Sequence, residues 1–177
     1  CILMLSSCSL ISNDDVVQID EESGLVLQNI ENISIWVPSN WNTISPSSLP
    51  VPKSGEVIFA MASKEERQGY LNNIVILKSQ NSLSESSLSL MKNSANFLGT
   101  QLQSFRLLSE EDISFNDAEK GLVLTFEWKY NSQTPLVTYL QTARVCGDIN
   151  YFATISLAEK PESYDRYVSV LRTLECQ

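Results

Sequence analysis

The feature that most constrains this chain is a pair of apolar segments, residues 135–146 and 150–157, which a very short turn connects. A Gly-Asp pair beginning at Gly147 fits the two central positions of a type II′ turn, whose twist matches that of antiparallel strands. In that register Cys146 lies opposite Ile149 and shares one face of the sheet with every second residue of the second segment. The pattern predicts a β-hairpin with one face turned toward a hydrophobic core.

Other segments add strands to this hairpin. Residues 122–130 form the clearest strand, because Leu, Phe, Trp and Tyr alternate with smaller or charged residues. Residues 57–62 and 73–78 are apolar on both faces, which is typical of interior strands in a sheet whose two faces are both covered by other elements. The charged residues 64–69 are interpreted as the turn between them. Shorter strands are expected at 25–27 and 33–37.

Two amphipathic helices are expected to pack on these strands. Between residues 84 and 105, apolar residues recur every three or four positions, which places them on one face of a helix. This stripe is interpreted as core packing rather than as a cofactor site. Pro161 and Glu162 open a second helix, because proline and a carboxylate both suit the first turn, and Cys176 closes it. The chain is therefore predicted to form one α+β domain.

The N-terminus resembles a lipoprotein processing signal. Residues 1–5 are apolar and the next two are small, as at the end of a signal peptide. Leu5-Ser6-Ser7-Cys8 resembles the bacterial lipobox, in which the cysteine thiol receives a diacylglyceryl group and the cysteine becomes the mature N-terminus. The apolar run is far too short to span a bilayer, which requires about 20 residues. An ordinary signal-peptide end, or a buried N-terminal strand that contains a cysteine, would explain the same pattern.

An acidic segment follows the lipobox-like motif. Residues 9–24 contain five carboxylates and no basic residue. Such a segment buries little apolar area and tends to stay extended, so we expect it to act as a spacer. The predicted organisation is a signal-peptide remnant at 1–8, a tether at 9–24 and one domain at 25–177. Lipidation at Cys8 would attach at least two acyl chains, which is enough for stable membrane anchoring.

Beyond Cys1 and Cys8, the chain has two cysteines, Cys146 and Cys176. An even number in an exported domain is typical of a disulfide. The hairpin turns Cys146 toward the face on which the last helix needs to pack, and Cys176 ends that helix, so the two sulfurs can meet. A bridge enclosing about 31 residues would stabilise the fold by roughly 3–4 kcal/mol. Two buried free thiols are the alternative. No C-x-x-C pair indicates a redox enzyme or a zinc ribbon.

Charge and residue types exclude several function classes. The 12 basic and 21 acidic residues give a net charge of -9, which argues against nucleic-acid binding and against attraction to anionic lipid. The absence of histidine removes histidine-based nucleophile systems and metal sites. No serine lies in a known nucleophile motif. The carboxylates at 110–112 lack the spacing of a calcium loop and are interpreted as a solvated turn. No catalytic, cofactor-binding or metal-binding residue is therefore assigned.

Several segments follow one another in a characteristic order: ISIWVPSNW, NNIVILKS, a long helix, KGLVLTFEWKY, ARVCGDINYFATIS and a terminal helix. This order resembles the PsbP-like superfamily, which includes DcrB-type bacterial lipoproteins and a Ran-binding import factor, and it covers about residues 25–177. The resemblance implies an α/β/α sandwich whose central antiparallel sheet is flanked by a long middle helix and a C-terminal helix. It also implies a non-catalytic assembly, accessory or binding role. No histidine matches the metal-binding residues of the photosynthetic branch.

We therefore expect a non-enzymatic lipoprotein of the bacterial cell envelope, anchored to the membrane through Cys8 and facing away from the cytoplasm. It would be a monomer that serves an envelope protein or complex as an accessory or binding domain, without nucleic acid or cofactor. One alternative is a soluble adaptor of the import-factor type, in which Cys146 and Cys176 stay reduced. Another is a hydrolase that works without histidine, which would need a pocket that gathers carboxylates with shifted pKa values.

Overall fold

The structure is a computed structural model, and it describes residues 19–177 except 53, 82, 103, 130–134 and 159. Cys8, the predicted signal-peptide remnant and most of the predicted tether lie outside the described residues. Within the described residues, eleven strands, two α-helices and a short 3-10 helix confirm the α+β class. In chain order they are β1 (Ile19–Asp20), β2 (Leu25–Ile30), β3 (Ile33–Pro38), β4 (Asn42–Thr43), η1 (Pro46–Ser48), β5 (Glu56–Arg67), β6 (Tyr70–Gln80), α1 (Ser87–Gln101), β7 (Arg106–Ser114), β8 (Lys120–Trp128), β9 (Val137–Cys146), β10 (Ile149–Leu157), α2 (Asp165–Arg172) and β11 (Glu175–Cys176).

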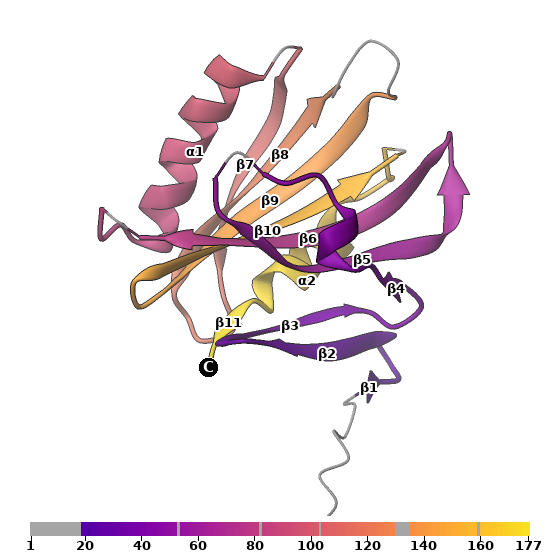
Figure 1. Ribbon diagram of the computed structural model, residues 1–177, viewed down its shortest axis with the longest axis horizontal. Coiled ribbons are helices and arrows are strands. Elements are labelled where there is room, and N and C mark those ends of the chain that lie inside the picture. Colours follow the sequence, from indigo (N-terminus) through magenta and orange to yellow (C-terminus); the bar gives the residue numbers. More distant parts are fainter. Residues whose placement is uncertain (1–18, 53, 82, 103, 130–134, 159) are drawn as a thin grey trace, which may run out of the picture.

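Seven strands form a large antiparallel sheet in the order β4-β5-β6-β10-β9-β8-β7 (Figure 1). Strands β7 to β10 follow one another as a meander, and β10 also pairs with β6. The β9–β10 turn has the predicted register, because Ile149 lies opposite Cys146. Gly147 has a φ angle of 63°, which the first central position of a type II′ turn requires. The predicted hairpin is confirmed.

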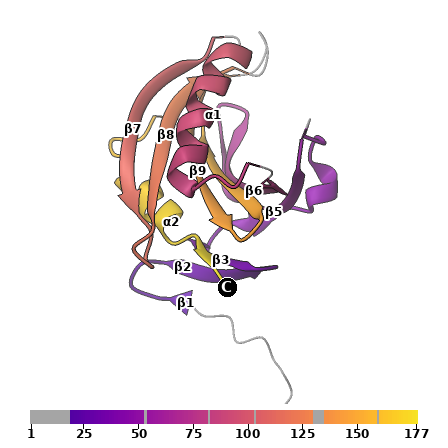
Figure 2. The same ribbon diagram turned by 90° about the vertical axis from the view of Figure 1, so that its left-hand side faces the viewer.

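A second sheet, in the order β1-β2-β3-β11, was not predicted as a separate unit. It lies below the large sheet in Figures 1 and 2, next to α2. It contains the end of the predicted tether, because Ile19 and Asp20 pair with Val26 and Leu25. The turn between these two strands is closed by a hydrogen bond from Gly24 N to Asp20 O of 2.9 Å. Strand β1 therefore lies within the segment assigned to the tether.

The two helices cover opposite faces of the large sheet (Figure 2). The apolar stripe of α1 packs on β8 and β9, as predicted, with Met91, Leu124 and Phe126 buried between them. Ser86 caps this helix, since its side chain accepts a hydrogen bond from Ser89 N. The other face packs against α2 and the small sheet, where Leu171 is fully buried. The large sheet is therefore buried on both sides along its central strands.

Four local predictions are wrong, each for a physical reason. Pro161 and Glu162 do not open the second helix, because α2 begins at Asp165, which itself supplies the carboxylate of the first turn. Cys176 does not end a helix: α2 stops at Arg172, and the next residues pair with β3 instead. Residues 110–112 are not a turn but part of the edge strand β7, whose side chains face solvent and therefore carry no apolar alternation. Residues 64–69 are largely strand as well, because the backbone ladder between β5 and β6 continues beyond their apolar parts and leaves a turn at Gln68 and Gly69.

Candidate functional site

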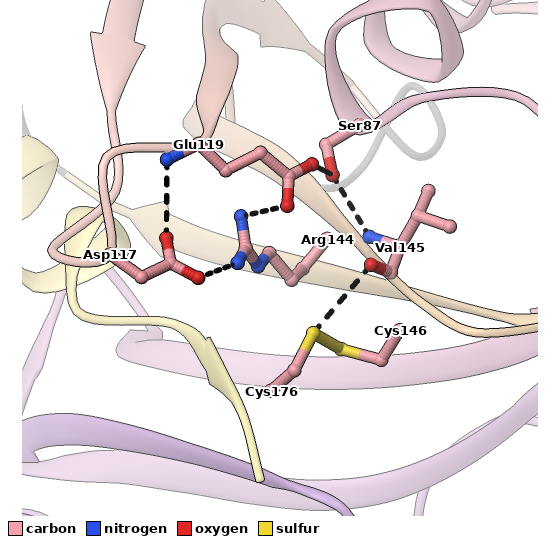
Figure 3. The surroundings of a disulfide bond; sticks show 7 residues. All are labelled: Ser87, Asp117, Glu119, Arg144, Val145, Cys146 and Cys176. Atoms are coloured by element: carbon pink, nitrogen blue, oxygen red, sulfur yellow. Dashed lines mark hydrogen bonds and ion pairs between the residues drawn. A yellow bond between two sulfur atoms is a disulfide. The ribbon is translucent and has the colours of Figure 1, made fainter.

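The disulfide predicted between Cys146 and Cys176 is present in the structure, with a Cα–Cα distance of 5.6 Å (Figure 3). Cys146 ends β9 and Cys176 lies in β11, so the bond ties the C-terminal strand to the edge of the meander. Neither sulfur is therefore available as a nucleophile. Cys8 lies outside the described residues, and its lipidation stays a prediction.

A buried arginine lies beside this disulfide. Arg144 precedes Cys146 by two residues, so both side chains point from the same face of β9. Its side chain is only 2% exposed and forms ion pairs with the carboxylates of Asp117 and Glu119, with the Glu119 oxygen 2.6 Å from Nη1. The guanidinium also stacks 4.6 Å from the centre of the Phe115 ring. One buried positive charge is thus held by two carboxylates and one aromatic face.

The same cluster reaches the beginning of α1 (Figure 3). The fully buried Ser87 donates its hydroxyl hydrogen to a Glu119 carboxylate oxygen at 2.5 Å and accepts a hydrogen bond from Val145 N at 3.0 Å. Glu119 N donates to Asp117 Oδ1 at 3.3 Å. We call Ser87, Asp117, Glu119 and Arg144 the Arg144 cluster. It joins α1, the turn between β7 and β8, and β9 at the point where the disulfide holds β11.

The chemistry of the Arg144 cluster is structural. An arginine side chain keeps its proton in proteins, so it does not serve as a base. Removing the carboxylates would leave a buried charge without a partner, which is the costly case for buried ion pairs. The serine hydroxyl is already used twice, and no histidine exists to activate it. The cluster can orient and hold three chain segments, and its two partly exposed carboxylates are both paired with Arg144.

The other features that bear on function are the possible metal ligands, the buried tyrosines and the two helices. Within the described part of the chain, no three His, Cys, Asp or Glu side chains are placed to hold a metal ion. Burial raises the pKa values of Tyr139, Tyr151 and Tyr164, which keeps these phenols neutral. Neither α-helix in the described residues has the length and apolar character that crossing a membrane requires.

A cleft of about 410 Å³ opens where the β5–β6 hairpin approaches the segment between β10 and α2. It is the feature that a hydrolase would need, but its charged lining is mainly basic. Among the residues that the structure describes, Lys64, Arg67, Lys160 and Arg166 line it, with Glu65 as the one carboxylate. The described lining of this cleft therefore differs from the carboxylate-rich site that the hydrolase alternative requires.

Sequence reasoning missed both the Arg144 cluster and the cleft. A signal for Arg144 was available, because a charged residue two positions before Cys146 shares its inward face and needs a buried partner. Asp117 and Glu119 follow a strand that was not predicted, so their approach to Arg144 had no signal. The cleft residues come from distant segments, such as those of Lys64 and Lys160, which are 96 positions apart. Only the tertiary arrangement brings them together.

No model of a known protein family matches this chain, and no curated protein matches it. Solved structures do match. The solution structure of cyanobacterial PsbP from Synechocystis has a TM-score of 0.53 at 14% identity and covers 98% of this chain and 99% of its own. A Pseudomonas aeruginosa protein of unknown function has a TM-score of 0.55 at 11% identity, covering 86% of this chain and 97% of its own.

The Ran-binding protein Mog1p from Saccharomyces cerevisiae has a TM-score of 0.50 at 12% identity, and the match covers 84% of this chain and 96% of that one. These identities are low, so the likeness concerns the fold and not the residues of a site. It extends over nearly all of each solved chain, and the matches include a PsbP and a Ran-binding protein, in agreement with the PsbP-like resemblance of the sequence segments. The chain therefore has a PsbP-like fold.

Proposed function

We propose that this chain is a non-enzymatic binding domain of the bacterial cell envelope, held at a membrane by lipid on Cys8 and facing away from the cytoplasm. The observation that supports export most is the Cys146–Cys176 disulfide. Disulfides persist in oxidising compartments and are rare where thiols are kept reduced. The lipobox-like motif that ends at Cys8 supports the anchor.

A binding role rests on two further observations. The side chains around the disulfide are arranged to hold the fold together rather than to react. One of the proteins with a similar fold is a Ran-binding protein. We therefore propose a protein partner in the envelope, served by a monomer of this chain, with neither nucleic acid nor cofactor involved.

The intact mass of native protein isolated from membranes tests this proposal. Samples are alkylated with and without prior reduction. The expected mass is that of residues 8–177 plus acyl chains, with Cys146 and Cys176 protected from alkylation until a reductant is added. A mass without lipid together with two freely alkylated thiols would contradict both export and anchor. The intracellular adaptor would then be the better hypothesis.

A matched pair of variants separates the anchor from general mislocalisation. Cys8→Ala should leave the protein without lipid and release it from the membrane fraction, because the thiol is the acceptor of the diacylglyceryl group. Cys1→Ala changes a cysteine on the other side of the motif and should leave lipidation intact. If the Cys8→Ala protein still fractionates with membranes in a detergent-sensitive way, the anchor assignment is wrong. If Cys8→Ala does release the protein, crosslinking of the wild type in intact cells would identify the partner of the anchored form.

A further inference from the structure

The basic cleft introduced above has a composition unlike the rest of the molecule. The chain carries 12 basic and 21 acidic residues, so an average stretch of its surface is acidic. The cleft lining nevertheless includes four of those basic residues and one carboxylate. Clefts lined by one sign of charge focus the electrostatic field and raise the local concentration of ions of opposite sign. This cleft therefore attracts anions on a protein that otherwise repels them.

The positive charges come from two sides of the cleft. Lys64 and Arg67 lie near the end of β5, whereas Lys160 and Arg166 flank the beginning of α2. Arg67 lies 3.4 Å from Glu65, which offsets part of its charge. Among the residues that the structure describes, Lys64, Lys160 and Arg166 form no ion pair. Three cations thus face one hollow, and no described carboxylate forms an ion pair with them.

The walls of the cleft are held in place by the fold. Asn72 Oδ1 accepts a hydrogen bond of 2.8 Å from Ala158 N, which joins the beginning of β6 to the segment that carries Lys160. Trp41 and Tyr167 line the cleft and also pack against the main hydrophobic core. A site whose walls are fixed before binding loses less conformational entropy when a ligand arrives. The cavity is therefore a preformed site rather than a gap between mobile loops.

The lining also contains a non-polar part. Trp41 and Tyr167 contribute aromatic surface, and Pro38 and Pro161 contribute apolar rings. A volume of about 410 Å³ falls in the usual range for small-molecule sites, roughly 300–1,000 Å³. Aromatic surface beside convergent charged groups is the usual composition of such sites, since the apolar part supplies contact area and the charges fix orientation.

We infer that this cleft binds a small organic anion, in which phosphate or carboxylate groups contact Lys64, Lys160 and Arg166 while a ring packs on Trp41 and Tyr167. The inference goes beyond the proposed function and does not depend on the anchor at Cys8. Phosphate and carboxylate share the chemistry that lysine and arginine recognise, namely charge-assisted hydrogen bonds to oxygen. The remainder of the ligand distinguishes it from free inorganic anions.

The test is an NMR titration of the full chain with four probes: phenyl phosphate, phthalate, inorganic phosphate and phenol. Phenyl phosphate or phthalate should shift the Trp41 indole and the amide signals of Tyr167, and should bind at least roughly tenfold more tightly than inorganic phosphate or phenol, because only they use both parts of the site. Tighter binding of phenyl phosphate assigns a phosphate ligand, and tighter binding of phthalate assigns a carboxylate ligand. Either order supports the inference.

Charge variants locate the binding. Lys160→Gln combined with Arg166→Gln should weaken phenyl phosphate and phthalate binding by roughly tenfold or more, since two charge-assisted contacts are lost. Arg172→Gln removes a charge from the same helix but outside the cleft, where Arg172 pairs with Glu111 at 2.9 Å, and should leave affinity unchanged. Equal losses in both variants would mean that net charge alone drives binding, which overturns the inference.

Two other results would also overturn it. One is the absence of any shift at Trp41 and Tyr167 with millimolar phenyl phosphate and phthalate. The other is tight binding of an acidic peptide, such as hexaglutamate, by a chain that binds neither small ring-bearing anion, because the cleft would then be a docking site for protein. Each of these results would overturn only the inference about the cleft. The mass measurement on Cys8 and the disulfide is independent of all of them.

Discussion

Loss of the Cys146–Cys176 disulfide should lower the free energy of unfolding by about 3.6 kcal/mol. The bond closes a loop with a sequence separation of 30 residues, and the chain-entropy relation evaluated for that length gives ~3.6 kcal/mol at 25 °C. That is a large part of the stability of a typical domain, roughly 5–15 kcal/mol. For a chain of this size it corresponds to a fall in melting temperature of roughly 7–15 °C.

Urea unfolding measures this loss in four forms: the wild type, Cys146→Ser, Cys176→Ser and the double variant. Each single variant should lose nearly the full amount, and the double variant should lose no more, because one bond is removed in every case. Reduced wild-type protein is the matched control and should agree with the double variant. Single losses that add up in the double variant, or a loss below about 1 kcal/mol, would refute the loop-entropy reasoning.

Two further predictions concern the neighbourhood of the disulfide. Asp117→Asn with Glu119→Gln should cost about 3 kcal/mol in urea unfolding, because a buried guanidinium loses both counter-charges; Glu111→Gln, which breaks an exposed pair, should cost under about 1 kcal/mol. Equal losses would mean that burial of the charge does not matter. Gly121→Ala should cost roughly 1–3 kcal/mol, since the added Cβ would lie 2.5 Å from a phenylalanine ring atom. Gly99→Ala has its nearest neighbour at 3.8 Å and should be neutral or stabilising by up to about 1 kcal/mol, so a Gly121→Ala protein of wild-type stability would contradict the packing argument.

The parts of the fold that were predictable are those in which local chemistry and burial agree. The turn at Gly147 determines the register of β9 and β10, and that register places Cys146 on the core face. The stripe on α1 was visible because the helix covers one face of the sheet and exposes the other side of its own surface. In these segments the spacing of apolar residues along the chain matches the period of the strand or helix. The sequence alone was therefore sufficient to predict the element.

The parts that were not predictable are stabilised by distant partners. Strand β7 lies at the sheet edge and its acidic residues 110–112 face solvent, so only backbone pairing with β8 makes it a strand. Strand β11 has two residues, and it exists because β3 lies beside it. Sequence periodicity carries no information about such pairings, which depend on where the rest of the chain has placed a neighbouring strand.

Among the candidate sites, the disulfide was predictable from the sequence, whereas the Arg144 cluster and the cleft were not. Cys146 and Cys176 were paired correctly even though Cys176 was assigned to the wrong element, because its approach to the core face did not depend on helix or strand. Arg144 and its partners were missed, since three separate segments meet there. The cleft required the β5–β6 hairpin to extend further than its apolar pattern, which carried Lys64 toward α2.

The small sheet has a consequence for the order in which the molecule can be completed. Its neighbours β3 and β11 are separated by most of the chain, and β11 reaches residue 176. The meander of β7 to β10 contains only short-range pairings and can form while synthesis or export is still in progress. The small sheet and the disulfide can be completed only after Glu175 and Cys176 have been synthesised. During synthesis from the N-terminus the meander can therefore precede the small sheet, which is complete only when β11 has paired with β3.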